Sequence, residues 1–216
     1  MTGPDSVAVV DSIEGIFSCR RNPAENIVLL PRPISGCFND LAFWLLKQNR
    51  WHDTLVADKS HYMETIYKVE DLDTFAKNDT MEWPEELDQI RDDMRVMQKA
   101  VGYRAELRVV RGRGYHPETH RFHVDGGAYR SALQAVDRVM CCYNKPTTEW
   151  VRKEDAIALP APSGFQCFEK KKDAPVFHFG VGDIWRQACV GDRSAALVHR
   201  AADTGPHDPP RLLVVC

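Results

Sequence analysis

The spacing of apolar residues changes near residue 103 and divides the chain into two parts. Before that point, the stretch 84–102 has apolar residues at helical spacing. Pro84 suits the first position of a helix, and Gly102 suits the position after its end. A second apolar segment, 39–48, opens with Asn39, which is a good N-cap residue. We therefore predict a helix-rich part over residues 1–102. The apolar residues on one face of the helix that we predict after Pro84 are Leu87, Ile90, Met94, Met97 and Val101.

From residue 103 onward the period is two. Short runs rich in β-branched and aromatic residues are separated by clusters of Gly, Pro, Asp and Lys, as strands are by turns. A helix-like pattern at 126–137 interrupts them, and the charged run 169–173 is typical of a hairpin tip. Seven or eight short strands predict a sandwich or small barrel. The runs are YRAELRVVRGR, HRFHVD, RVMCCYN, AIAL, VFHFGVGDIW, AALVH and RLLVVC.

We interpret the chain as a single α+β domain over residues 1–216, in which the helical part packs on a β core at 103–216. The formal net charge is −3 with both signs interspersed, so bulk charge does not favour nucleic acid or a membrane surface as a partner. No apolar stretch reaches the roughly 18 residues that span a bilayer. Seven cysteines without C-x-x-C spacing indicate reduced, mostly buried thiols and a cytoplasmic protein.

His123 and Asp125 are the first candidate metal ligands in the sequence. Side chains two residues apart on a strand project to the same face, so this pair can bind one metal ion. His199, near the end of another predicted strand, offers a third ligand. Two histidines and one carboxylate on one face of a metal leave open positions, as in non-haem Fe(II) oxygenases. The alternative for each residue is a buried polar side chain bonded to backbone.

Arg211 is a candidate ligand for an organic acid bound at the same site. An iron centre of this kind needs electrons to activate dioxygen, and a 2-oxo acid is a common donor whose distal carboxylate requires a fixed cation. Arg211 opens the last predicted strand, shortly after His199. Tyr143 and Thr148 are candidate hydroxyl donors to the same carboxylate, or else core residues. Arg108 either points into the barrel or lies on a solvated strand face.

The ordered segments RFHVD, TEWV, LVHR and RLLVV resemble the Fe(II)/2-oxoglutarate-dependent dioxygenase superfamily, whose core is a double-stranded β-helix, or jelly roll. In that family the His-x-Asp doublet lies on the second core strand, the distal His on the seventh and the 2-oxoglutarate Arg or Lys on the eighth. VMCCYNKPTTEWV and VGDIW are similar to stretches of its prolyl-hydroxylase-like members. The likeness covers residues 84–216 and extends to an uncharacterised bacterial family; the first eighty residues show none.

The resemblance implies an enzyme that consumes O2 and 2-oxoglutarate and releases succinate and CO2, with hydroxylation as the default outcome. The near-neutral charge argues against nucleic acid, and we expect a small-molecule substrate, such as an amino acid or a biosynthetic intermediate, rather than a protein. The loop at 112–120, with His116 and His120, and the segment 126–137 would border the opening. Two alternatives remain, a cupin-like metalloenzyme that uses no oxo acid and a non-catalytic jelly roll that binds or senses a metal. The sequence does not indicate the oligomeric state. The implied Fe(II) ligands are His123, Asp125 and His199, and the implied 2-oxoglutarate ligands are Arg211, Tyr143 and Thr148.

Overall fold

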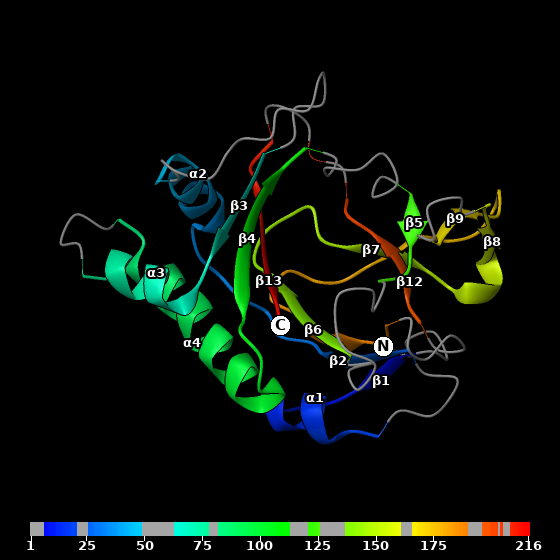
Figure 1. Cartoon of the computed structure of the whole chain (residues 1–216), viewed down its shortest axis with the longest axis horizontal. Coiled ribbons are helices and arrows are strands. Elements are labelled where there is room, and N and C mark those ends of the chain that lie inside the picture. The colour runs from blue at the N-terminus through cyan, green and yellow to red at the C-terminus, as the bar shows by residue number, and fades with distance from the viewer. Residues whose placement is uncertain are drawn as a thin grey trace.

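Two β-sheets face one another, and the helices pack on the outer face of the larger sheet (Figure 1). This arrangement is seen in a computed structural model that describes residues 7–20, 26–48, 63–77, 82–112, 121–125, 137–160, 166–189, 196–202, 204 and 208–216. The fold is therefore mixed α+β, as predicted. None of the helices in these ranges is long and apolar enough to cross a membrane.

The larger sheet has seven strands in the order β1-β2-β11-β6-β13-β4-β3. β1 and β2 pair in parallel, and the other neighbours pair antiparallel. The strands are β1 (Val7–Val9), β2 (Ile27–Leu30), β3 (Met63–Tyr67), β4 (Glu106–Arg111), β6 (Arg138–Cys142), β11 (Ile184–Gln187) and β13 (Arg211–Val215).

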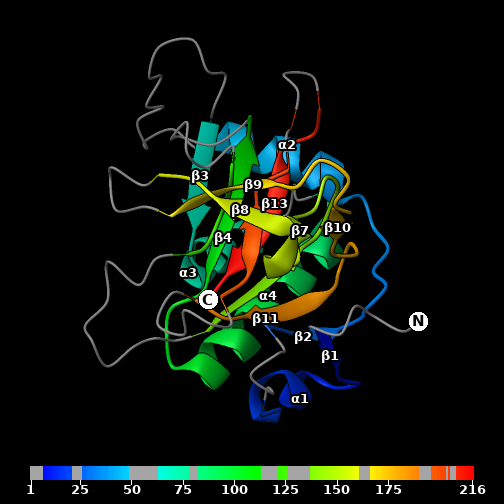
Figure 2. The same cartoon turned by 90° about the vertical axis from the view of Figure 1, so that its right-hand side faces the viewer.

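The smaller sheet has six strands in the order β10-β7-β12-β5-β9-β8, all antiparallel. Figure 2 shows β7, β8 and β9 lying in front of the large sheet. Between β4 and β7 the chain crosses from one sheet to the other at every strand, and it does so again between β10 and β13. The strands are β5 (Phe122–His123), β7 (Glu149–Val151), β8 (Ala156–Ala158), β9 (Cys167–Lys170), β10 (Phe177–His178) and β12 (Val198–Arg200).

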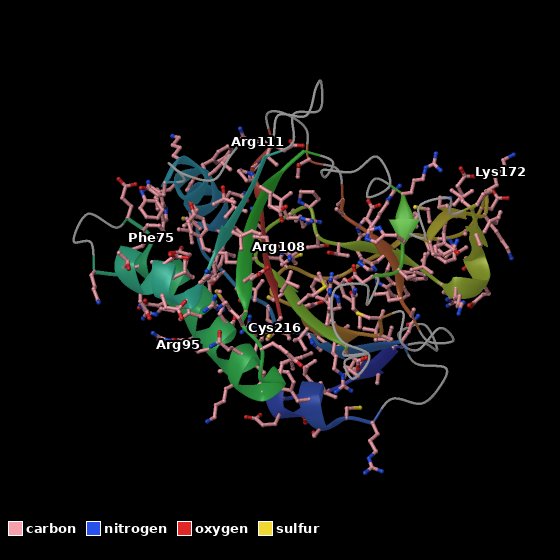
Figure 3. All side chains as sticks on the ribbon, in the orientation of Figure 1. Phe75, Arg95, Arg108, Arg111, Lys172 and Cys216 are labelled. Carbon is pink, nitrogen blue, oxygen red and sulfur yellow. The ribbon has the colours of Figure 1, made fainter. Side chains whose placement is uncertain are left out.

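The helices are α1 (Ile13–Ser18), α2 (Phe38–Gln48), α3 (Val69–Phe75) and α4 (Pro84–Val101), and a 3-10 turn covers Lys153–Asp155. α4 confirms the predicted start and stop, since Gly102 follows it with a left-handed φ of 74°. Figure 3 places Phe75 and Arg95 on this helical side and Lys172 at the opposite end of the molecule, beyond β9.

Asn39 does not have the predicted capping role. α2 begins one residue earlier, at Phe38, so Asn39 lies inside the first turn. Its side-chain oxygen instead accepts a hydrogen bond from the Asn144 side chain, 3.0 Å away. The residue therefore ties the helix to the end of β6.

The two faces of the large sheet bury different clusters because side chains alternate along its strands. On β6, Val139 and Cys141 face the helices, whereas Met140 and Cys142 face the small sheet. Both thiols are buried, because both faces are covered. We call the second group of side chains the inter-sheet cluster. It consists of Ile27, Met140, Cys142, Trp150, Phe179, Trp185, Leu197, Leu213 and Val215.

The N-terminal part also contains strands that the periodicity did not predict. β1, β2 and β3 extend the large sheet on both sides of its central strands. The run VFHFGVGDIW forms two strands in different sheets, β10 and β11, rather than one. Gly182 has a φ of 86°, and a Cβ atom there would lie 2.5 Å from the Arg32 carbonyl oxygen, so this turn requires glycine. The segment 126–136 and residues 113–120 lie outside the described residues.

Candidate metal centre

His123, Asp125 and His199 come together on the inner side of the small sheet. His123 on β5 lies directly opposite His199 on β12, and their ring centroids are 4.7 Å apart. Asp125 follows His123 by two residues and lies on the same side. The distance from Asp125 to Nε2 of His123 is 4.0 Å, and to Nε2 of His199 it is 3.4 Å. All three residues are buried, and one ligand atom from each lies within 4.8 Å of the others.

Both imidazole rings have their orientation set by the strand that carries them. Nδ1 of His123 lies 3.0 Å from the Arg121 carbonyl oxygen, and Nδ1 of His199 lies 3.1 Å from the Leu197 carbonyl oxygen. A carbonyl oxygen only accepts, so each Nδ1 must carry the proton and donate it. Each Nε2 therefore keeps its lone pair on the side of Asp125. This is the tautomer that a metal-ligating histidine uses.

The large sheet supplies hydrogen-bond donors to the same cluster. Arg138 on β6 and Gln187 on β11 are directly opposed in the register of that sheet. The Arg138 guanidinium donates to Oδ1 of Asp125 at 2.9 Å, and the Gln187 amide donates to Oδ2 at 2.9 Å. Gln187 is also 3.3 Å from Nε2 of His199. The candidate ligands thus come from one sheet, and the groups that hold the carboxylate come from the other.

The electrostatics favour an anionic carboxylate beside neutral imidazole. Burial lowers the pKa of His199 to about 4, although Asp125 opposes the shift, so the ring is uncharged at neutral pH. Burial raises the pKa of Asp125, but His199, Arg138, His123 and Arg108 together lower it below its usual value. Because the His199 ring is neutral near pH 7, Arg138 is the closest cation that keeps the carboxylate ionised. His199 and Asp125 therefore carry the protonation states that metal binding requires.

The donor set and its spacing fit a first-row divalent metal. Ligand atoms about 2.1 Å from such an ion and at right angles to one another are about 3.0 Å apart. Nε2 of His199 and Oδ2 of Asp125 are 3.4 Å apart. Small movements of these side chains would bring the three ligands to bonding distance. Two imidazole nitrogens and one carboxylate oxygen on one side would leave the remaining positions open.

Arg211 is the first residue of β13 and is buried, with 5% of its surface exposed. Side chains two residues apart on a strand share a face, so Arg211 projects to the same face of β13 as Leu213 and Val215. Those two residues belong to the inter-sheet cluster, so the Arg211 side chain lies between the two sheets. Its Nη1 atom is buried and has no hydrogen-bond partner in the described part of the chain. A buried guanidinium nitrogen without an acceptor is costly, which makes this position a candidate anion site.

Thr148 and Arg211 both lie near the side chain of Cys142. The Thr148 hydroxyl is 3.9 Å from Sγ of Cys142. Burial raises the pKa of the Cys142 thiol, and the Arg211 guanidinium opposes that shift, so it lies near the sulfur. The prediction that Thr148 and Arg211 could contact one ligand is compatible with this placement.

Tyr143 does not lie with these two residues. Its hydroxyl donates to Asp93 on α4 at 2.6 Å, and its ring packs against Phe38, 5.5 Å between centroids. The physical reason is alternation, because Cys142 faces the small sheet and the next residue must face the helices. The geometry therefore gives Tyr143 a structural role on the helical side, together with the Arg32–Asp93 ion pair, in place of the predicted contact with an oxo acid.

Asn144 is a residue whose role sequence reasoning missed. Its side-chain nitrogen donates to the Pro210 carbonyl at 2.8 Å, and its side-chain oxygen accepts from the Leu212 amide at 2.8 Å. The two bonds bracket Arg211 and fix the start of β13. Gln187 and Arg138 were missed as well. A polar residue at an inward position of an otherwise apolar strand, such as Gln187 after Trp185, is the only signal that the sequence offered.

The other predicted polar residues have mixed outcomes. Arg108 projects from β4 and forms ion pairs with Glu106 at 2.9 Å and with Glu64 at 3.6 Å. Its charge still acts on Asp125. His116 and His120 lie outside the described residues.

No protein-family model matches the chain, and no curated protein matches it. Among solved structures, the chain is similar to a C-terminally truncated thymine-7-hydroxylase of Neurospora crassa in its apo form. The identity is 12% and the TM-score 0.35, and the match covers 88% of this chain and 80% of that chain. A likeness this distant does not assign an activity, so the function proposed below rests on the geometry of this chain.

Proposed function

We propose that the protein is a non-haem Fe(II)- and 2-oxoglutarate-dependent oxygenase that hydroxylates a small molecule, with release of succinate and CO2. The observation that carries the proposal is the buried guanidinium of Arg211, which faces the same interior as the His–Asp–His cluster. A metal site alone needs no such cation. An oxo acid that chelates a metal through one end and carries a carboxylate at the other requires both features.

The order of the strands supports the jelly-roll core that the resemblance implies. Apart from the β8–β9 hairpin, eight strands from β4 to β13 fall into two groups of four, β4-β13-β6-β11 and β10-β7-β12-β5. Counted along the chain, His123 is then on the second strand, His199 on the seventh and Arg211 on the eighth. Eight antiparallel strands in two facing sheets are the composition of a jelly roll.

Each residue of the site would have a separate task. His123, His199 and Asp125 would hold the iron, which together with 2-oxoglutarate supplies the activation of dioxygen. Arg211 and Thr148 would orient the oxo acid through its distal carboxylate. Arg138 holds Asp125 ionised. Phe179 stacks on the fully buried Trp185, at 4.0 Å between ring centroids, and this pair would line the interior beside the site with apolar surface.

Anaerobic titration tests the proposal. Fe(II) followed by 2-oxoglutarate should give a visible charge-transfer band in the wild-type protein and none in the His199→Ala variant, which lacks one ligand. A protein that binds Fe(II) but gives no band on addition of 2-oxoglutarate is a cupin-like enzyme or a metal-binding protein instead. Absence of Fe(II) binding, measured by calorimetry under the same conditions, rejects the metal centre altogether.

A further inference from the structure

The amide of Gln187 has one orientation only. The indole nitrogen of Trp185 is a donor that cannot accept, and it lies 2.9 Å from Oε1 of Gln187. The oxygen of the amide is therefore turned towards Trp185, and its NH2 group is turned towards the His–Asp–His cluster. Both Trp185 and Gln187 are fully buried, so water does not compete for these bonds.

The NH2 group of Gln187 contacts two of the three candidate ligands at the atoms that would bind a metal. It lies 2.9 Å from Oδ2 of Asp125 and 3.3 Å from Nε2 of His199. The two N–H bonds of the amide match these two acceptors in number. A buried amide here thus satisfies acceptors that burial would otherwise leave unpaired.

These hydrogen bonds and metal coordination compete at His199. Because Nδ1 of His199 is protonated and donates to Leu197, Nε2 has a single lone pair in the ring plane. That lone pair can accept a hydrogen bond from Gln187 or bind a metal, but it cannot do both. Oδ2 of Asp125 has more than one lone pair, so its bond to Gln187 is compatible with a metal.

We propose that Gln187 is an internal surrogate for the metal, which holds Asp125 and His199 in place without an ion and must release His199 before an ion can bind. The inference rests on the metal centre proposed above and adds a regulation of it. Gln187 stabilises the protein before it is loaded and weakens its affinity for metal. Loading then depends on the concentration of free metal, because His199 must give up its bond to Gln187 while the bond between Gln187 and Asp125 remains.

The test compares Gln187→Leu with the wild-type protein in two measurements. Leucine has a similar size but donates no hydrogen bond, so the melting temperature of the metal-free protein should fall by about 3–6 °C. The affinity for Mn(II), measured by anaerobic calorimetry, should rise about tenfold, because the metal no longer displaces a hydrogen bond. Opposite changes in stability and metal affinity are the signature of a surrogate. A purely structural glutamine would lower the first without raising the second.

Two further variants complete the test. Gln166→Leu is the matched control, because its amide also makes two hydrogen bonds, to the carbonyl oxygens of Leu159 and Cys167, and neither acceptor is a candidate ligand. It should lower the melting temperature and leave the Mn(II) affinity unchanged. Gln187→Met has a similar length, donates no hydrogen bond and adds no oxygen ligand, so it should also bind Mn(II) more tightly than wild type, and it decides the question if the leucine variant does not fold.

The outcomes separate the surrogate from the metal centre itself. Wild-type protein that binds Mn(II), with unchanged or weaker binding by the Gln187 variants, overturns the surrogate and leaves the metal centre intact. Failure of both the wild-type protein and Gln187→Met to bind Mn(II) overturns both. Tighter binding by the Gln187 variants supports both.

Discussion

Replacement of Arg211 by methionine should have opposite effects on stability and on ligand binding. Arg211 is 5% exposed, and its Nη1 atom lacks an acceptor in the described part of the chain. Methionine has a similar length and no charge, so it removes the desolvation cost of the guanidinium. We expect the free energy of unfolding to stay the same or to rise by about 1–2 kcal/mol.

The same substitution should weaken the binding of 2-oxoglutarate strongly. Loss of one partner of a buried, hydrogen-bonded charge pair costs about 2–5 kcal/mol, which is a decrease in affinity of about 30-fold or more. Arg211→Lys retains the charge but not the two parallel N–H groups, so its affinity should lie between those of the wild type and the methionine variant. Affinity for Fe(II) should not change in either variant.

Two titrations measure these effects. Urea denaturation gives the free energy of unfolding, and anaerobic titration of the Fe(II)-loaded protein with 2-oxoglutarate, followed by its visible band, gives the affinity. Arg91→Met is a matched control, because Arg91 pairs with Asp88 on α4, on the helical side of the large sheet. Our reasoning is refuted if Arg211→Met loses several kcal/mol of stability while 2-oxoglutarate binds as before, since Arg211 would then be a structural cation.

Three further predictions follow from the site and its surroundings. The pKa of His199 is lowered from 6.5 to about 4, so between these values the unfolded chain binds a proton that the folded chain does not. The free energy of unfolding of metal-free protein should therefore fall by about 3 kcal/mol in total as the pH drops through this window. His199→Phe should make this dependence on pH weaker, as measured by urea denaturation at several pH values. An equal dependence in both proteins would contradict this. Tyr143→Phe should lower the free energy of unfolding by about 1–3 kcal/mol, through loss of the bond to Asp93, and leave 2-oxoglutarate affinity unchanged; a weaker affinity in the titration would return Tyr143 to the ligand site. Thr148→Val should weaken 2-oxoglutarate binding about 3- to 10-fold in the same titration, through loss of one hydroxyl donor, and unchanged binding would remove Thr148 from the site.

The sequence anticipated the features that local periodicity controls. α4 begins at Pro84 and ends before Gly102 because a proline at the first position and a left-handed glycine at the end are local requirements. Alternation also placed His123 and Asp125 on one side of a strand, because side chains two apart on a strand always share a face. The same rule, applied from Cys142, would have turned Tyr143 away from the site.

The sequence could not anticipate which strands become neighbours. β1, β2 and β3 are short, and they become strands because the open edges of the large sheet offer them hydrogen-bond partners. In the same way, the run VFHFGVGDIW divides between two sheets because the chain turns at Gly182 against the Arg32 backbone. Both outcomes depend on contacts far away in the chain, which the local pattern does not contain.

The sequence by itself determined which residues could carry the chemistry, since only certain side chains offer a metal a lone pair or a carboxylate a guanidinium, and their order along the chain was visible. Only the tertiary structure decided which of them meet. Asp125 and Gln187, 62 positions apart in the chain, are brought together by the packing of one sheet on the other, and this packing also buries Arg211 and gives His199 its low pKa. Burial converts ordinary polar residues into a site, because outside water a charge or lone pair must find a specific partner.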